Sequence, residues 1–128
     1  MHAVDTNVLV RLLIGDDEKQ AAAAESFLAK SSGGWISHLV LAESVWVLES
    51  VYARTAVQIG AALETLLDHA SLAVQDPEVV AAALLQFRRH RGVGFSDCLA
   101  LEIARKAGHL PMATFDKRFG KVSGTRRL

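Results

Sequence analysis

Two hydrophobic patterns alternate along the chain. Short apolar runs of three or four residues are typical of buried strands, and longer segments with apolar residues at helical spacing are typical of amphipathic helices. The runs predict strands that end at Asp5 and span 35–37, 72–74 and 112–115, with a possible edge strand in 121–128. The longer segments predict helices over 8–14, 17–30, 38–52, 56–70, 77–91 and 95–106, and a single turn at 117–119. This alternation predicts an α/β fold with a central, mainly parallel sheet of four to five short strands and helices on both faces.

Helix boundaries are marked by polar residues. Asp16 is the expected cap of the second helix, and Thr55 with Gln58 has the form of a capping box. The segment 38–52 is apolar almost all round, which indicates a helix that is buried or lies in a subunit interface. We therefore expect Trp35 and Trp46 to pack in the core.

The chain has 128 residues, of which 51% are hydrophobic, so we expect a single globular domain spanning 1–128. No apolar run has the length of a membrane span, and no secretory signal is evident at the N-terminus. The one cysteine, Cys98, suits a reducing compartment, and its lack of a histidine partner indicates a packed residue rather than a nucleophile. A cytoplasmic protein without a membrane partner is the expectation.

The net charge of zero hides a polarised distribution. Residues 1–83 contain 4 basic and 11 acidic side chains, whereas residues 84–128 contain 10 basic and 3 acidic ones. A basic flank of this kind could attract phosphates, but solvated helix surfaces of different charge explain it more simply.

Four acidic residues stand at unusual positions. Asp5 and Asp116 each end a predicted strand, Asp97 opens a predicted helix, and Glu43 lies inside the apolar segment 38–52. Helix capping could explain each aspartate separately, and Glu43 could emerge at a helix edge. One acidic pocket would explain all four. Since converging carboxylates repel, such a pocket needs a cation, and oxygen ligands without histidine or cysteine favour Mg²⁺ or Mn²⁺. A cation held in this way suits phosphodiester hydrolysis.

The acidic residues lie in four successive motifs: Asp5-Thr6-Asn7, Leu41-Ala42-Glu43-Ser44, Phe95-Ser96-Asp97-Cys98-Leu99-Ala100 and Thr114-Phe115-Asp116-Lys117-Arg118-Phe119. In order and spacing these motifs resemble the PIN-domain ribonucleases, and most of all the VapC-type toxins of prokaryotic toxin–antitoxin pairs. The resemblance implies a PIN-like fold, Mg²⁺- or Mn²⁺-dependent cleavage of RNA, a homodimer and a cognate antitoxin protein.

The same resemblance identifies four carboxylates as the catalytic and metal-binding residues. They form the acidic quartet Asp5, Glu43, Asp97 and Asp116. The resemblance also makes their polar neighbours candidates to hold metal-bound waters or to orient carboxylates, namely Thr6, Asn7, Ser96 and Thr114. Nearness in the sequence to Asp5 and Asp116 makes three basic residues candidates to contact RNA phosphates, namely Arg11, Lys117 and Arg118.

Other readings fit less well. A haloacid-dehalogenase-type phosphatase needs an aspartate where this chain has Asn7, and a response-regulator receiver needs one directly after the strand at 72–74. A catalytically degenerate PIN-like interaction domain remains the alternative. Its mark would be the loss of an acidic residue, and none is lost.

Overall fold

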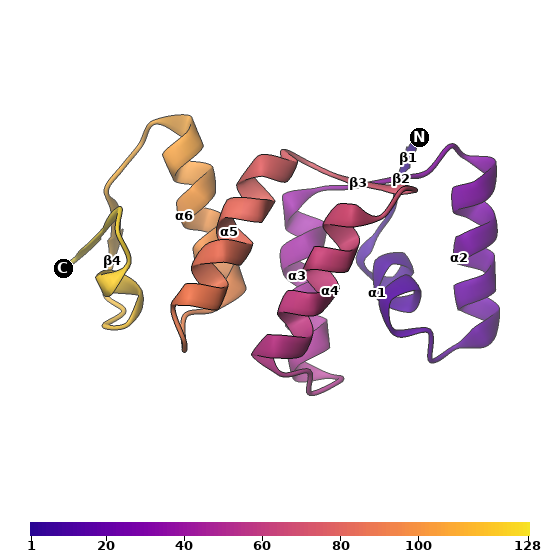
Figure 1. The fold of residues 1–128 in the computed structure, drawn as a ribbon, viewed down its shortest axis with the longest axis horizontal. Coiled ribbons are helices and arrows are strands. Elements are labelled where there is room, and N and C mark those ends of the chain that lie inside the picture. The colour runs from indigo at the N-terminus through magenta and orange to yellow at the C-terminus, as the bar shows by residue number, and fades with distance from the viewer. The chain divides into compact units, whose positions relative to one another are not determined.

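The computed structural model describes all residues from 1 to 128, and they form two compact units (Figure 1). Unit 1 is Met1–Pro77 and unit 2 is Glu78–Leu128. Helices and parallel strands alternate, so the prediction of an α/β fold is confirmed. None of the helices combines the length and the apolar character that crossing a membrane requires.

Unit 1 contains a three-stranded parallel sheet in the order β1-β2-β3. Its strands are short: β1 is His2–Ala3, β2 is Gly34–Ile36 and β3 is Leu72–Val74. Gly34 and Ile36 are buried, whereas Trp35 between them points to the opposite face and is 39% exposed. One face of the sheet therefore carries the core of unit 1, and Trp35 lies outside that core.

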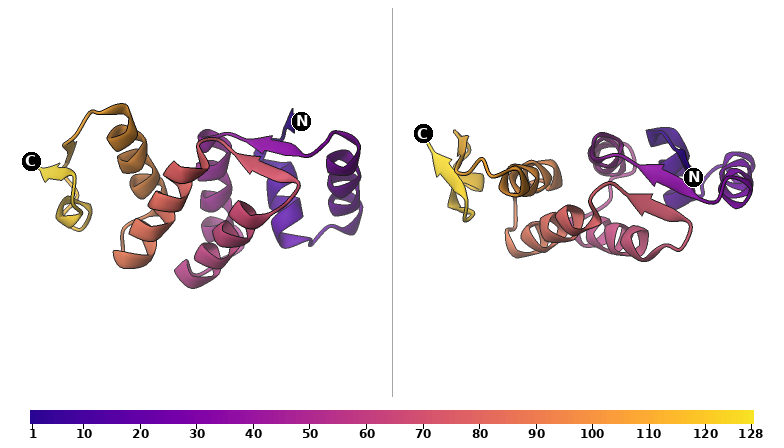
Figure 2. Two further views of the ribbon diagram at one scale, coloured as in Figure 1. Left: turned by 45° about the horizontal axis from the view of Figure 1, so that its top comes forward. Right: turned by 90° about the horizontal axis from the view of Figure 1, so that it is seen from above.

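Four helices follow or connect these strands, and Figure 2 shows them from two further directions. Their bounds are α1 (Thr6–Ile14), α2 (Glu18–Lys30), α3 (His38–Ser50) and α4 (Ala56–Asp68). Helix α1 packs against both α2 and α3. The capping box of α4 is present as predicted. The cap of α2 is Asp17 rather than Asp16, because Asp16 pairs with Arg11 instead.

Helix α3 buries one stripe only, formed by Leu41, Ser44, Val45 and Leu48. Leu39 and Trp46 lie on the opposite stripe and are 76% and 63% exposed. The expectation that both tryptophans pack in the core is therefore wrong. The cause is that α3 is apolar on more than one side, so composition could not indicate which stripe faces the core.

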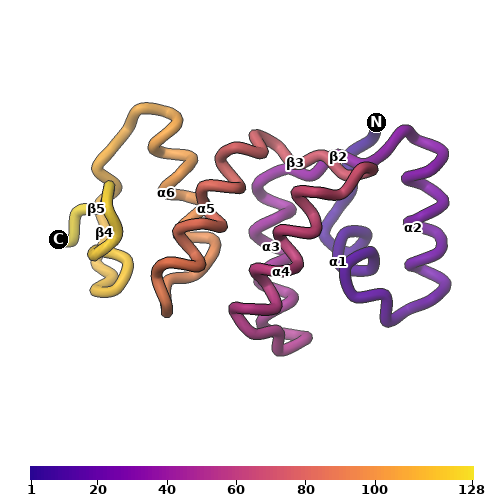
Figure 3. The backbone as a smooth tube through the Cα atoms, in the orientation of Figure 1, coloured from indigo at the N-terminus to yellow at the C-terminus, as the bar shows by residue number.

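Unit 2 contains two helices and a second, separate sheet, which Figure 3 shows near the C-terminus. The elements are α5 (Pro77–Arg89), α6 (Phe95–Ala107), β4 (Met112–Thr114), the 3₁₀ turn η1 (Phe119–Lys121) and β5 (Thr125–Arg127). The rings of Phe87 and Phe95 meet edge to face at 6.0 Å and join α5 to α6.

The five strands are thus divided between two sheets, where the sequence predicted one central sheet. Strand β4 pairs in parallel with β5, with Met112 opposite Thr125. The two strands are close in the sequence, so bringing them together closes only a short loop. Hydrophobic periodicity finds strands but does not indicate which strands pair.

Candidate active site

Asp5 lies in unit 1, between the end of β1 and the start of α1. Its Oδ1 accepts a hydrogen bond of 3.0 Å from the backbone N–H of Val8, so Asp5 is the N-cap of α1. The residue is exposed, and the cap bond leaves Oδ2 available to a ligand. Capping and ligand binding are therefore compatible at this carboxylate. Thr6 is buried in the first turn of α1, whereas Asn7 faces solvent.

A cavity of about 340 Å³ opens beside Asp5, between α1 and α2. Its wall combines apolar and polar groups: Asp5, Asn7, Val8, Arg11, Gln20, Ala23, Ala24 and Phe27. The α2 residues of the wall recur at helical spacing, so they form one stripe that faces α1. Gln20 and Phe27 were not among the residues predicted from the sequence, although this spacing is a signal that could have indicated them.

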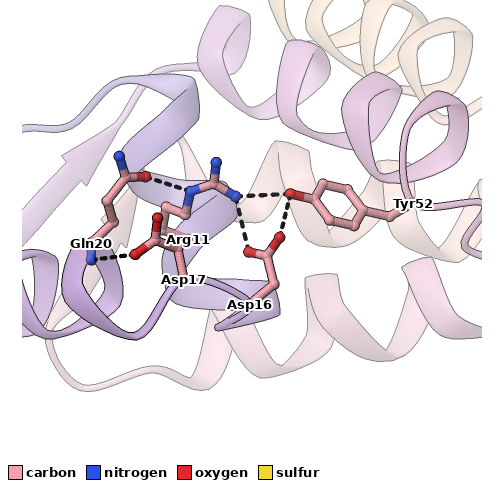
Figure 4. A network of polar contacts seen from close by, with 5 residues as sticks. All are labelled: Arg11, Asp16, Asp17, Gln20 and Tyr52. Atoms are coloured by element: carbon pink, nitrogen blue, oxygen red, sulfur yellow. Dashed lines mark hydrogen bonds and ion pairs between the residues drawn. The ribbon is translucent and has the colours of Figure 1, made fainter.

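Arg11 is the centre of a polar network that Figure 4 shows. Its Nη1 donates to Asp16 at 2.9 Å and to the hydroxyl of Tyr52 at 2.8 Å, and its Nε donates to Oε1 of Gln20 at 2.6 Å. The Tyr52 hydroxyl in turn donates to Asp16 at 3.0 Å. The network ties α1 to α2 and to the segment after α3.

These contacts favour the charged forms of both ionic partners. The hydrogen bond with Tyr52 raises the pKa of Arg11 further above its ordinary value, against the effect of desolvation. Desolvation opposes ionisation of Asp16, but the hydrogen bond from Tyr52 and the charge of Arg11 outweigh it and lower the pKa of Asp16. Arg11 is therefore a fixed cation of unit 1, next to the cavity that contains Asp5.

Glu43 lies on the exposed stripe of α3, between Leu39 and Trp46. Its carboxylate makes no hydrogen bond or ion pair within unit 1, so it is free to bind a ligand. This side of α3 meets solvent, so Glu43 is exposed. The alternative in which Glu43 meets water describes its surroundings correctly.

Asp97 and Asp116 lie near each other in unit 2. Asp97 is in the first turn of α6, but the cap of that helix is Gly94, and no side chain caps it. Partial burial raises the pKa of Asp97, and the negative charge of Asp116 raises it further. A helix cap would be stabilised by its hydrogen bonds, whereas Asp97 has none within unit 2 and has an anion as its neighbour. Two carboxylates in this relation are suited to share a cation.

Asp116 also holds the turn that follows β4. Its Oδ1 accepts from the N–H of Phe119 at 2.7 Å, and its own N–H donates to Oγ1 of Thr114 at 3.0 Å. Thr114 therefore positions the backbone of Asp116. Ser96 is exposed in the first turn of α6, one residue before Asp97.

The two basic residues after Asp116 are exposed. The guanidinium of Arg118 lies against Gly92, whose φ of +84° and missing side chain allow this close approach. Gly92 thus belongs to a packed loop of unit 2. Lys117 and Arg118 both remain accessible to an anion.

The four carboxylates divide equally between the units, with Asp5 and Glu43 in unit 1 and Asp97 and Asp116 in unit 2. Neither unit by itself gathers three or more His, Cys, Asp or Glu side chains into a group that could hold a metal ion. Each unit contributes two of these four exposed carboxylates. Their oxygens form the donor set that Mg²⁺ and Mn²⁺ prefer.

Cys98 and Glu102 of α6 are the buried ionisable residues of unit 2. Burial raises the pKa of the Cys98 thiol to about 11, with further contributions from Asp97 and Glu102. Cys98 is thus a packed residue, as predicted. Glu102 pairs with Arg105 at 3.1 Å, and Arg105 also donates to the carbonyl of Ser123 at 2.9 Å, so this pair fastens α6 to the C-terminal segment.

Similarity to known proteins is found at the level of family, sequence and structure. The profile of the PIN domain family matches residues 3–124. A VapC ribonuclease of Aquifex aeolicus (strain VF5) is 29% identical over 125 residues, which are 95% of this chain and 92% of the relative. Among solved structures, VapC20 of Mycobacterium tuberculosis, described as a sarcin-ricin loop cleaving toxin, is 20% identical with a TM-score of 0.44. That match covers 98% of this chain and 97% of the other.

Proposed function

Because the chain belongs to the PIN domain family, we propose that it is a metal-dependent endoribonuclease that acts as the toxin of a toxin–antitoxin pair. The observation that carries the proposal is the pair Asp97 and Asp116. They are two neighbouring carboxylates of unit 2, and after burial the negative charge of Asp116 is the second cause of the raised pKa of Asp97. A fold retains such a pair at a cost in stability, which is typical of a functional site. The name of the Aquifex relative also supports a ribonuclease.

In this proposal Asp5 and Glu43 of unit 1 and Asp97 and Asp116 of unit 2 would be the ligands of Mg²⁺ or Mn²⁺. The donor set fits, because all four side chains are exposed carboxylates. The bound ion would supply an activated water and would stabilise negative charge on the phosphate.

We also propose roles for the residues next to these four carboxylates. The N-cap bond from Val8 fixes the direction of the Asp5 carboxylate. The bond from the N–H of Phe119 does the same for the carboxylate of Asp116, whose backbone is held by Thr114. Asn7 and Ser96 are exposed next to the acidic residues and would hold waters of the ion or oxygens of the RNA. Lys117 and Arg118 would bind flanking phosphates.

We further propose a homodimer and an antitoxin partner. Trp46 and Val51, which follow Glu43 towards the C-terminal end of α3, are large and solvent-facing and support an apolar interface there. Light scattering of the purified protein should give the mass of a dimer, and Trp46→Glu should shift it to a monomer. A wild type that is monomeric at high concentration would contradict the homodimer and would leave the nuclease proposal intact.

The nuclease is tested by incubating the purified chain with end-labelled RNA in Mg²⁺, in Mn²⁺ and in excess chelator. We expect cleavage with either ion and none with chelator. Glu43→Gln and Asp97→Asn should abolish cleavage. The matched control is Glu49→Gln, which removes an exposed carboxylate from the same helix as Glu43 but outside the quartet.

Full cleavage in chelator, or in the quartet variants, would overturn the proposal. Absence of cleavage by the wild type under all conditions would favour the degenerate PIN-like interaction domain. In cells, induction of the chain alone should arrest growth, and induction of Asp97→Asn should not.

A further inference from the structure

The cavity beside Asp5 is lined on one side by Arg11 and Gln20, which present hydrogen-bond donors, while Asp5 and Asn7 are its other polar residues. Arg11 has no acceptor atom, so Gln20 must turn its carbonyl oxygen towards Nε of Arg11, as the bond of 2.6 Å shows. The amide nitrogen of Gln20 is then left without a partner. The second terminal nitrogen of Arg11, Nη2, makes no bond either, since Nη1 takes both Asp16 and Tyr52. Figure 4 shows these two unbonded nitrogens on the same side of the network.

The remaining α2 residues of the wall are apolar and include an aromatic ring. Phe27 is 41% exposed, and Ala23 and Ala24 precede it on the same stripe of α2. His2 contacts the Phe27 ring edge-on, with the centroids 5.7 Å apart and the planes at 60°. A flat ligand could stack on such a wall while its polar edge meets the donors of Gln20 and Arg11.

We propose that this cavity binds an unpaired nucleobase of the RNA substrate and reads its acceptor edge, with guanine as the preferred base. This inference rests on the proposed ribonuclease function, because it places the base next to Asp5. Two neighbouring donors require two neighbouring acceptors, which guanine offers at O6 and N7 and cytosine at O2 and N3. Adenine carries an amino group beside N7, and that group would face the donors of the cavity.

Size favours guanine over cytosine. The cavity volume of about 340 Å³ leaves room for a bicyclic base, and a larger ring covers more of the Phe27 wall. Arg11 is suited to this task because Tyr52, Asp16 and Gln20 already hold its side chain in place, so little conformational freedom is lost on binding. The assignment makes Gln20, Arg11 and Phe27 specificity-determining residues.

The first test measures binding without catalysis. The variant Asp97→Asn should not cleave RNA, and Asp97 belongs to unit 2 and does not line the cavity. This variant is therefore titrated with GMP, AMP, CMP and the 7-deaza analogue of GMP. The readout is the ¹⁵N-resolved NMR signal of the Gln20 side-chain amide. We expect GMP to shift this signal and to bind at least about threefold more tightly than AMP or the 7-deaza analogue, which lacks the N7 acceptor. A tighter complex with CMP would assign cytosine to the cavity and overturn guanine.

The second test measures the cleavage sites of the active protein on RNA of random sequence. Gln20→Glu replaces the donor amide by an acceptor and should remove the preference for guanine, and Phe27→Ala should weaken binding of every base. The matched control is Lys19→Gln, which alters the net charge by the same amount at the neighbouring, exposed position of α2. It should retain the cleavage pattern of the wild type.

The outcomes separate this inference from the proposed function. Metal-dependent cleavage with the same site preference in Gln20→Glu, Phe27→Ala and the wild type would overturn the base site and leave the nuclease intact. Guanine-selective shifts of the Gln20 amide without any RNA cleavage would support the base site and contradict the nuclease. Equal binding of all nucleotides, or none, would also overturn the base site.

Discussion

Asp5 is a helix cap and a proposed metal ligand, and two substitutions should separate these two roles. Its Oδ1 caps α1 through the N–H of Val8, and its carboxylate is one of the proposed metal ligands. Asp5→Asn retains an oxygen that can accept the cap bond and removes the charge. Asp5→Ala removes both. We expect both variants to lose at least about a hundredfold in RNA cleavage, because even groups that only orient a metal ligand contribute about ten- to a hundredfold.

The two variants should differ in stability. Asparagine caps helices about as well as aspartate, whereas alanine at an N-cap costs about 1 kcal/mol, with a range of roughly 0.5–2 kcal/mol. In a chain of this length, 1 kcal/mol corresponds to a fall in melting temperature of about 3–5 °C. Asp5→Ala should therefore melt several degrees below the wild type, and Asp5→Asn should melt at or slightly above it.

Asp17 provides a matched control. It caps α2 through the same kind of hydrogen bond, accepting from the N–H of the third residue onward, Gln20, at 3.0 Å, but it does not belong to the quartet. Asp17→Ala should lose about as much stability as Asp5→Ala and should still cleave RNA. Melting curves and initial cleavage rates of the wild type and these three variants give the comparison. If Asp5→Asn cleaves RNA like the wild type, Asp5 is a helix cap only, and the reasoning for the quartet fails.

Three further outcomes are expected. Burial and Asp116 raise the pKa of Asp97, so its charged form destabilises the fold as pH rises through that pKa. In chelator, Asp97→Asn should therefore melt above the wild type at pH 7, and the difference should vanish in acid. Melting curves of the two proteins that superimpose at every pH would contradict the repulsion. With a pKa of about 11 and a buried side chain, Cys98 should react with iodoacetamide at pH 8 only as the protein unfolds, and rapid labelling of the folded protein would disagree with its packed position. Tyr52→Phe removes the hydroxyl that joins Arg11 to Asp16, so thermal unfolding should begin at a lower temperature and the pKa of Asp16, measured by NMR titration, should rise. An unchanged pKa of Asp16 would mean that Arg11 alone stabilises this carboxylate.

Local features could be predicted from the sequence because nearby residues determine them. The capping box at Thr55 was found where the sequence placed it, and α5 and α6 begin at residues 77 and 95, as predicted. The four acidic motifs were likewise identified from residue types and order alone. The structure places Asp5 at the predicted junction of strand and helix.

Which of two neighbouring residues caps a helix depended on contacts with residues distant in the sequence. Asp16 and Asp17 are equally good caps by sequence. Asp17 caps α2 because Tyr52, which comes after α3, and Arg11 hold Asp16 elsewhere. The same reason explains why Gln20 was not predicted, since its amide is oriented only when α2 packs against α1.

The sequence by itself determined the alternation of helices and strands, the family motifs and the chemistry of the carboxylates, because these follow from periodicity and residue type. Only the tertiary structure decided which stripe of α3 faces the core, how the strands divide between two sheets, and which side of Arg11 is left to a ligand. Each of these depends on which surfaces pack together. A helix that is apolar on several sides, such as α3, permits more than one packing, and only the neighbouring elements select the stripe that is buried.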